Sequence, residues 1–321
     1  MQMIHLARWL SVGALACSLA AHAQEYPSRL VTLVVPFAPG GGTDLVARPV
    51  AEKLREKWGQ TFLIDNRAGA GGNIGAEHVF RAAGDGYMLL LVTPGQMAIN
   101  KYLYDSIAYE PEQFSPVSVL TNSPNVLVVH PKLGVSNVRQ LIAKAKAEPD
   151  KLNYGSSGVG TTTHLSTELF KSMTGTRMVH IPYKGAAAYL ADMTGGTLDV
   201  SFFLLGTALP QIRAGKLRAI GVGGATRSSA LPDVPTVSED VPGFYSTVWY
   251  GIVSAPKTPP AITARLSAAM AEAVRQPSIA ALFANSGLDV VGSTPAEMAL
   301  LVRQENERWS KVVRATGAKV E

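Results

Sequence analysis

The feature that most constrains this chain is a strand, a glycine turn and a helix start that follow one another near its beginning. Residues 31–35 (Val-Thr-Leu-Val-Val) are apolar and β-branched, as in a buried strand. Pro36 and Pro39 end this run, and three glycines at 40–42 let the backbone turn with no Cβ in the way. Thr43 is a helix-capping residue type, and an amphipathic segment follows it. Such a turn offers free amide N–H groups and the positive end of a helix dipole, which together favour an anion.

Two more units of the same kind follow. Residues 61–66 form an expected strand before a glycine-rich turn at 67–75, and residues 87–92 form another before Thr-Pro-Gly at 93–95. Three βα units in succession predict a parallel sheet with right-handed crossovers, and such sheets bind ligands at the carboxyl ends of their strands. One glycine turn alone is usually a matter of chain geometry, whereas three glycine-bearing loops at one edge favour a binding site.

The second half of the chain shows a second cycle of strands and helices. Further strands are expected at 114–121, 125–130, 151–154, 178–181, 198–204, 217–222 and 248–254. Further helices are expected at 137–147, 165–173, 260–275 and 295–316. Because the last two helices have no sheet of their own, we expect them to pack on the first domain, so that the chain crosses between domains twice.

The predicted fold class is therefore α/β, with two doubly wound α/β domains joined by a two-crossing hinge. Domain 1 is expected to cover 24–124 plus 246–321, and domain 2 to cover 125–245. A hinge between two loop-lined sheet edges predicts a cleft that can close.

Residues 1–23 are predicted to be a secretory signal peptide. Arg8 precedes an apolar run at 9–21, and Ala21-His22-Ala23 is a small-residue cleavage site. The alternative, a permanent transmembrane helix, requires a longer apolar run. The only cysteine, Cys17, lies inside this segment, so the mature chain is expected to be exported and to contain no thiol.

Composition and motifs exclude several classes of function. The formal charge is +5 with 17% charged residues, and no basic stripe with interleaved aromatic residues occurs, so no nucleic-acid partner is predicted. Ile74 stands where a dinucleotide fingerprint needs its third glycine, and no glycine-lysine phosphate loop occurs, so no nucleotide cofactor is predicted. No histidine pair has metal-ligand spacing, so no metal site is predicted.

Two serines support an enzyme as the alternative hypothesis. Gly155-Ser156-Ser157-Gly158-Val159 resembles a nucleophile elbow, although Val159 stands where glycine is needed. No catalytic residue is predicted, and a secreted hydrolase that uses Ser156 or Ser157 remains the competing hypothesis.

Other residues suit binding. A second possible anion site lies near an expected helix start, although a helix cap with a polar loop explains it equally well; its residues are Ser156, Ser157, Thr161, Thr162 and Thr163. Lys184 and Gly185 follow an expected strand, where a solvated lysine is the simpler interpretation. Asp44 suits the first turn of a helix, and its functional role would be to meet a donor group of the ligand.

Several motifs resemble one known family, the substrate-binding receptors of tripartite tricarboxylate transporters (Bug or TctC type). The resemblance covers the chain from about Tyr26 to its end, with Ala68 where many members carry proline. The matching segments are Pro-Phe-Ala-Pro-Gly-Gly-Gly-Thr-Asp at 36–44, Asn-Arg-Ala-Gly-Ala-Gly-Gly-Asn-Ile-Gly at 66–75, Asp-Gly-Tyr at 85–87, Tyr-Gly-Ser at 154–156, Pro-Tyr-Lys-Gly at 182–185 and Gly-Thr-Leu-Asp at 196–199.

The resemblance implies a periplasmic two-domain receptor, like a type II periplasmic binding protein, that closes on a small organic carboxylate. It also implies a monomer that delivers its ligand to the membrane components of the transporter, and no cofactor. A partner that presents the ligand to a membrane sensor is the other possibility. Carried over by motif, the ligand-binding residues are Phe37, Ala38, Gly41, Gly42, Thr43, Asp44, Ser156, Ser157 and Thr161, with Lys184 and Gly185 as a weaker match.

Overall fold

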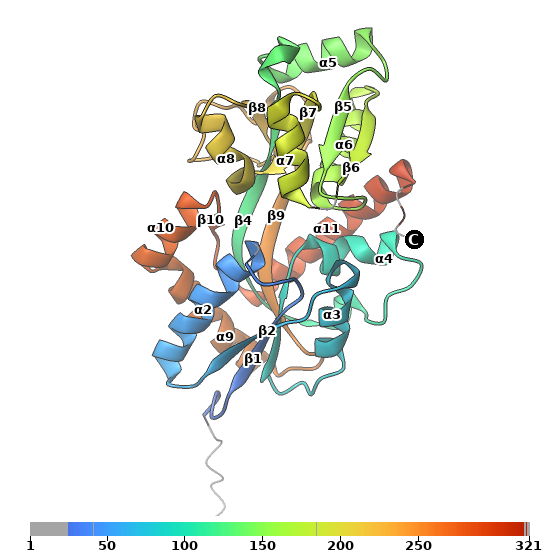
Figure 1. Cartoon of the computed structure of the whole chain (residues 1–321). Coiled ribbons are helices and arrows are strands. Elements are labelled where there is room, and N and C mark those ends of the chain that lie inside the picture. Colours follow the sequence, from blue (N-terminus) through green and yellow to red (C-terminus); the bar gives the residue numbers. More distant parts are fainter. Residues whose placement is uncertain (1–24, 41, 184, 318, 320–321) are drawn as a thin grey trace, which may run out of the picture.

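The chain folds around a long, curled sheet with helices on its faces (Figure 1). The computed structural model describes residues 25–40, 42–183, 185–317 and 319. Its strands are β1 (Val31–Val35), β2 (Phe62–Asn66), β3 (Met88–Val92), β4 (Ser115–Val129), β5 (Asn153–Ser156), β6 (Val179–Pro182), β7 (Val200–Leu204), β8 (Arg218–Val222), β9 (Thr247–Ser254) and β10 (Asp289–Val290). The strand order is β2-β1-β3-β9-β4-β7-β5-β6, and both β8 and β10 also pair with β4. The predicted α/β fold class is confirmed.

The helices cover both faces of this sheet. They are α2 (Gly42–Trp58), α3 (Asn73–Phe80), α4 (Asn100–Leu103), α5 (Val138–Ala147), α6 (Thr162–Thr174), α7 (Ala186–Gly195), α8 (Leu205–Arg213), α9 (Pro260–Arg275), α10 (Pro277–Asn285) and α11 (Pro295–Thr316). Short 3₁₀ turns lie at 70–72, 111–113, 131–133 and 237–239, and a π-helical turn at Gly95–Ile99 leads into α4. No helix in the described part of the chain is long and apolar enough to cross a membrane.

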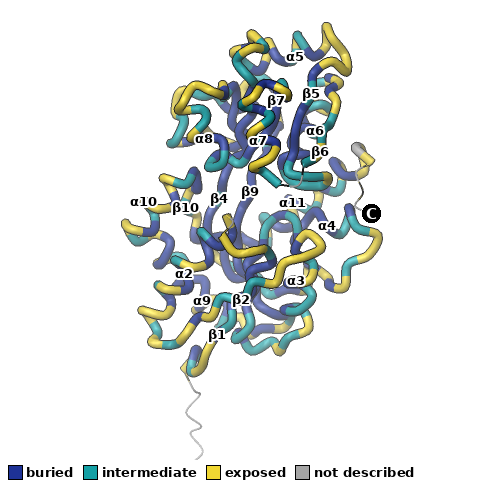
Figure 2. The backbone as a smooth tube through the Cα atoms, viewed as in Figure 1, coloured by how far each residue is buried: buried dark blue, intermediate teal, exposed yellow. Residues whose placement is uncertain are grey.

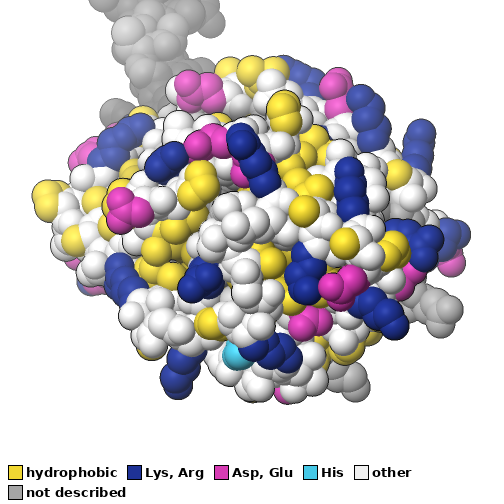
Figure 3. All heavy atoms as spheres, turned by 90° about the horizontal axis from the view of Figure 1, so that it is seen from above, with side chains coloured by type: hydrophobic (Ala, Val, Ile, Leu, Met, Phe, Trp, Pro, Cys, Tyr) yellow, Lys and Arg dark blue, Asp and Glu magenta, His cyan; other side chains and the backbone are white. Residues whose placement is uncertain are grey.

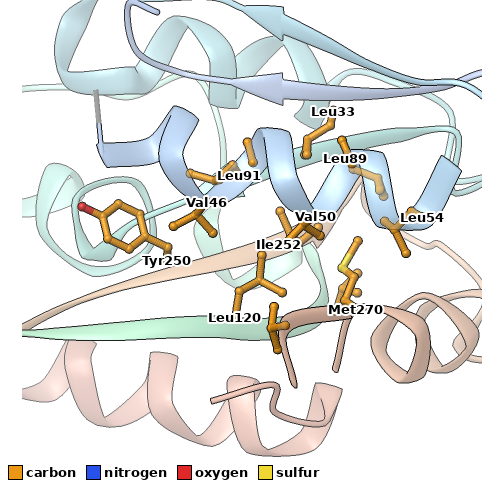
Figure 4. Close-up of a cluster of buried hydrophobic side chains, with 14 of the residues drawn as sticks. Leu33, Val46, Val50, Leu54, Leu89, Leu91, Leu120, Tyr250, Ile252 and Met270 are labelled. Atoms are coloured by element: carbon orange, nitrogen blue, oxygen red, sulfur yellow. The ribbon is translucent and has the colours of Figure 1, made fainter. Parts of the chain in front are cut away.

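Lobe 1 contains β1–β3, β9 and β10 with α2, α3, α9 and α10. Its first three strands are parallel, as predicted, whereas β9 is antiparallel to β3. Figure 4 shows how side chains of α2, such as Val46, Val50 and Leu54, pack on Leu89 and Ile252 from the sheet. The opposite face of the sheet is covered by α3 and the first part of α11. The glycine turn after β1 is thus fixed by a helix whose apolar side is buried.

Lobe 2 contains β5–β8 with α5–α8, and β4 joins the two lobes. Residues 115–124 of β4 pair with β9, and residues 125–129 pair with β7 and β8. The sequence predicts two strands separated by Asn122-Ser123-Pro124, but the structure has one continuous strand. Pro124, which has no N–H to donate, lies where the partner strand changes, so the ladder tolerates it. Figure 2 shows β4 and β9 buried along their length between the lobes.

The chain returns to lobe 1 through residues 246–247, next to the crossing in β4. The two crossings are tied together, because Asn125 Nδ2 donates to Ser246 Oγ at 2.8 Å and Ser246 N donates to Gly223 O at 2.8 Å. We propose that domains 24–124 plus 246–321 and 125–245 hinge at this pair of crossings, as the sequence predicts.

Helix α11 contacts both lobes. Met298 and Val302 near its start pack in lobe 1, as predicted. Its second half instead reaches α6 of lobe 2, because a helix of this length extends about 33 Å. There it completes a buried group that we call the interlobe cluster: Ala98, Ile99, Leu103, Leu165, Trp309, Val312 and Val313.

Candidate functional site

A cavity of about 210 Å³ lies between the lobes. We call it the central cavity. It is lined by Phe37, Gly71, Thr93, Gly95, Gln96, Ile99, Asn100, Leu103, Tyr104, Val159, Gly160, Thr161, Thr162, Leu204 and Val248. The loops after β1, β2 and β3 all contribute to this lining, as expected for the carboxyl ends of parallel strands.

A second cavity, of about 370 Å³, adjoins the central cavity at Leu204. We call it the side cavity. It is lined by Gly42, Leu45, Ser123, Leu204, Gly206, Thr207, Tyr250, Asn285, Ser286 and Leu288. Helices α2 and α8 begin at this cavity and α6 begins at the central one, so the positive ends of three helix dipoles face the space between the lobes.

Two buried amides hold the loops of lobe 1 together. Gln96 is fully buried; its Oε1 accepts hydrogen bonds from Thr93 N at 3.0 Å and Thr93 Oγ1 at 2.9 Å, and its Nε2 donates to Gly71 O at 2.7 Å. Asn100 Nδ2 donates to Asn73 Oδ1 at 2.6 Å. Sequence reasoning placed residues 93–96 at the ligand-binding edge of the sheet but assigned no role to Gln96, and it missed Asn100. The only available signal was the position of Gln96 directly after the third glycine-bearing loop.

Only some of the predicted binding residues line the two cavities. Phe37 and Thr161 line the central cavity, and Gly42 lines the side cavity. Ala38 is exposed on the loop beside Phe37. Gly41 and Lys184 lie outside the described residues.

Thr43, expected to cap the helix, lies instead in the first turn of α2, which already begins at Gly42. Its side-chain hydroxyl is buried and has no hydrogen-bond partner among the described residues. Thr161 is the N-cap residue of α6, and its hydroxyl accepts from His164 N at 3.4 Å.

Ser156, Ser157 and Gly185 belong to lobe 2 and are not among the residues that line the central cavity. Ser157 N donates to Thr163 Oγ1 at 3.1 Å, and Gly185 N donates to Ser157 O at 3.3 Å. Ser156 is fully buried, and its Oγ lies 2.7 Å from His180 Nε2. Neither serine lines the central or the side cavity.

Asp44 has its carboxylate engaged within the protein. Oδ2 accepts from Gly40 N at 2.8 Å and Arg48 Nε at 3.0 Å, and Oδ1 accepts from Asn66 Nδ2 at 3.0 Å. Burial acts to raise the pKa of Asp44, but the hydrogen bonds from Asn66, Gly40 and Arg48 outweigh it and lower the pKa below its ordinary value. Asp44 therefore holds the glycine loop of residues 37–40 against α2 and β2.

Replacing Asp44 by alanine should loosen this loop. We expect Asp44→Ala to lower the free energy of unfolding by about 2 kcal/mol, because three part-buried hydrogen bonds to a charged group are lost. Urea denaturation measures this change. Glu52→Ala is the matched control on the same helix, since Glu52 is exposed and pairs with Arg55 on the surface, where losing an ion pair changes the free energy of unfolding little. Equal losses in the two variants would contradict the assigned role of Asp44.

Two stacked histidines support the loop of lobe 2. The rings of His164 and His180 lie 4.2 Å apart, and Tyr154 stacks on His180 at 4.7 Å. His164 Nδ1 accepts from Gly160 N at 3.1 Å, so the neutral ring holds a residue that lines the central cavity. Burial, then the charge of His164, lowers the pKa of His180 to about 4, and burial also lowers the pKa of His164.

These two pKa values give a pH dependence with a defined sign. The unfolded chain binds protons at both histidines below about pH 6.5, whereas the folded chain resists them. The free energy of unfolding should therefore fall as the pH drops from about 6.5 towards 4. Above about pH 6.5 this pair should not make the free energy of unfolding depend on pH. Melting temperatures across this range should fall less steeply in His180→Gln than in the parent, whereas the control His78→Gln should follow the parent. Parallel profiles for all three proteins would refute this.

Comparisons with known proteins place the chain among solute-binding proteins. Residues 46–318 match the model of the "Tripartite tricarboxylate transporter family receptor". Protein BugT of Bordetella pertussis is 36% identical over 325 residues, which covers 100% of both chains. The solved structure of R. palustris Rpa4515 with adipate is 40% identical, has a TM-score of 0.79 and covers 91% of this chain and 99% of its own. MatC from Rhodopseudomonas palustris with bound malate is 32% identical, with a TM-score of 0.76, and covers 90% of this chain and 100% of its own.

Proposed function

Because the chain belongs to the tripartite tricarboxylate transporter receptor family, whose members are binding proteins rather than enzymes, we propose that it captures a small organic carboxylate between its lobes. The family predicted from the motifs is confirmed, and so is the prediction that the chain is no enzyme. The serine hydrolase alternative is wrong, and the buried position of Ser156 agrees with this.

The observation that carries the proposal is the set of helix starts around the two cavities. Amide N–H groups at the starts of α2, α6 and α8 have no partners within their own helices and favour an anion through their dipoles. Uncharged donors can hold a carboxylate when several of them converge. The relatives named above have structures with adipate and malate, and both of these compounds are carboxylates.

The proposed binding cycle uses the two crossings between the lobes. The loops of Phe37 and Gly42 belong to lobe 1, and the loop of Thr161 belongs to lobe 2, so a carboxylate between them would draw the lobes together. Asp44 and His164 would keep the two loops in place for this contact.

A thermal-shift screen over organic acids tests the proposal. A bound acid at about 100 times its Kd should add about 2.7 kcal/mol to the free energy of unfolding, which raises the melting temperature. Uncharged amides of the same acids are the matched controls and should give no rise. The proposal fails if calorimetry detects no acid that binds, or if the amides bind as tightly as the acids.

We also propose that the mature protein acts in the periplasm as a monomer and delivers its ligand to the membrane components of a tripartite transporter. Residues 1–23, the predicted signal peptide, lie outside the described residues. Mass spectrometry of the exported protein should find Gln24 at its amino terminus, and a chain with lipidated Cys17 would contradict this.

A crosslinking experiment on intact cells separates transport from sensing. Capture of a transporter membrane subunit would support delivery for transport, whereas capture of a sensor kinase would favour the alternative.

On the face in Figure 3, basic and acidic side chains are interspersed rather than separated by sign. This face therefore shows no basic field of the kind that binds nucleic acid.

A further inference from the structure

We infer that the ligand is an acid whose body is an unsubstituted hydrocarbon, with neither an ammonium group nor further charged groups beside its carboxylate ends. This inference rests on the proposed function and narrows it. It assigns specificity to the wall between the two cavities, centred on Leu204.

Apolar side chains from both lobes form a large part of the wall of the central cavity. Ile99 and Leu103 enter from lobe 1 and are almost fully buried, and Val159 and Leu204 enter from lobe 2. Val248 enters from β9, next to the point where the chain crosses between the lobes. A hydrocarbon segment placed here loses contact with water on several sides, which favours binding in proportion to the area covered.

The described lining residues of both cavities include no lysine, arginine, aspartate or glutamate. An ammonium group in this space would need a carboxylate partner, and the carboxylate of Asp44, two residues after Gly42, is already bonded to Gly40, Arg48 and Asn66. An unpaired charge in such a site costs far more than an uncharged polar group. The cavities therefore reject α-amino acids more strongly than the corresponding acids without the amino group.

The polar groups that remain free lie near the ends of the apolar wall. Tyr250 is 5% exposed and lines the side cavity, and its hydroxyl has no hydrogen-bond partner among the described residues. Thr207 lies in the same cavity at the start of α8, and Thr162 lies in the central cavity at the start of α6. Neutral donors at helix starts on both sides of Leu204 suit carboxylate ends joined by a hydrocarbon.

Calorimetry with matched pairs of ligands tests the inference on the full mature chain. The pairs are adipate and 2-aminoadipate, hexanoate and 2-aminohexanoate, and 3-phenylpropanoate and phenylalanine, with citrate as a highly charged reference. In each pair that binds, the acid without the amino group should bind at least tenfold more tightly, and citrate should bind at least tenfold more weakly than the best acid. If an amino acid or citrate binds as tightly as the best acid, the inference is overturned while the proposed function stands. If no compound of this series and no acid of the thermal-shift screen binds to the folded protein, the proposed function fails instead.

Substitutions of Leu204 locate the specificity. Leu204→Asn has a side chain of similar shape but adds a polar amide, so its Kd for the best acid should be at least tenfold higher than that of the parent. The Kd of Leu204→Met should stay within threefold of the parent value. Leu63→Asn is the matched control on an exposed leucine of lobe 1 and should bind like the parent. Circular dichroism checks that each variant is folded. If folded Leu204→Asn binds the best acid as tightly as the parent, Leu204 does not set the specificity.

Discussion

Gly42→Val should weaken carboxylate binding by at least tenfold, which corresponds to about 1.4 kcal/mol, while the protein stays folded. A Cβ at this position would lie 2.8 Å from the Tyr250 hydroxyl oxygen, closer than nonbonded atoms approach. Figure 4 shows the Tyr250 ring beside Val46 of α2, and both belong to the same buried core cluster, so the ring has little room to move. The valine would also occupy space in the side cavity. Calorimetry with the best acid measures the loss.

The control for this variant is Gly195→Val. Gly195 is exposed near the end of α7, and a Cβ there would meet no atom within 4 Å. The same chemical change should therefore leave binding unaffected. Circular dichroism should show both variants folded, since Gly42 is exposed at the surface. Parent-like binding by Gly42→Val would exclude the start of α2 as a ligand contact.

Trp309→Ala should lower the free energy of unfolding by about 3–5 kcal/mol, the range typical of a fully buried aromatic side chain. Trp309 is fully buried in the interlobe cluster, where α11 meets Leu165 of lobe 2 and Leu103 of lobe 1. Its Nε1 also donates to Glu305 Oε2 at 2.8 Å, so the variant removes a hydrogen bond from a buried carboxylate. Urea denaturation followed by circular dichroism measures the change.

Trp58→Ala is the control for this loss. Trp58 ends α2 at the surface of lobe 1, is partly exposed and stacks on Phe62 at 5.7 Å. Removing its side chain should lower the free energy of unfolding clearly less than Trp309→Ala does, because the site is partly open to water and leaves no closed cavity. A smaller loss in Trp309→Ala than in Trp58→Ala would show that the interlobe cluster contributes little to stability.

Local sequence determined most elements of lobe 1. Strand β1 and helices α9 and α11 have the predicted bounds, and β2 and β3 begin one residue later than predicted. These elements carry their own start and stop signals. An apolar β-branched run ends at Pro36, and α11 begins with the capping box of Thr294 and Glu297. The glycine motifs also identified the family, because a turn that must present backbone amides restricts its residues strongly.

Sequence reasoning failed where pairing between distant segments overrides a local signal. Asn122-Ser123-Pro124 has turn composition, yet β9 pairs along it and keeps β4 continuous. Helix α10 and strand β10 were missed, since both are short and β10 exists only through its pairing with β4. Propensity is a weak guide wherever tertiary contacts supply most of the free energy.

The sequence by itself determined that glycine loops and a serine loop take part in a binding fold of the receptor family, because those motifs are local. Only the tertiary structure decided how their side chains are used. The Asp44 carboxylate accepts a hydrogen bond from Asn66, which follows it by 22 positions, and Ser156 is fully buried while Thr161 lines the central cavity. Leu204 borders both cavities although nothing in its neighbourhood marks it. Burial and hydrogen-bond satisfaction depend on which distant segments meet, and no local pattern contains that information.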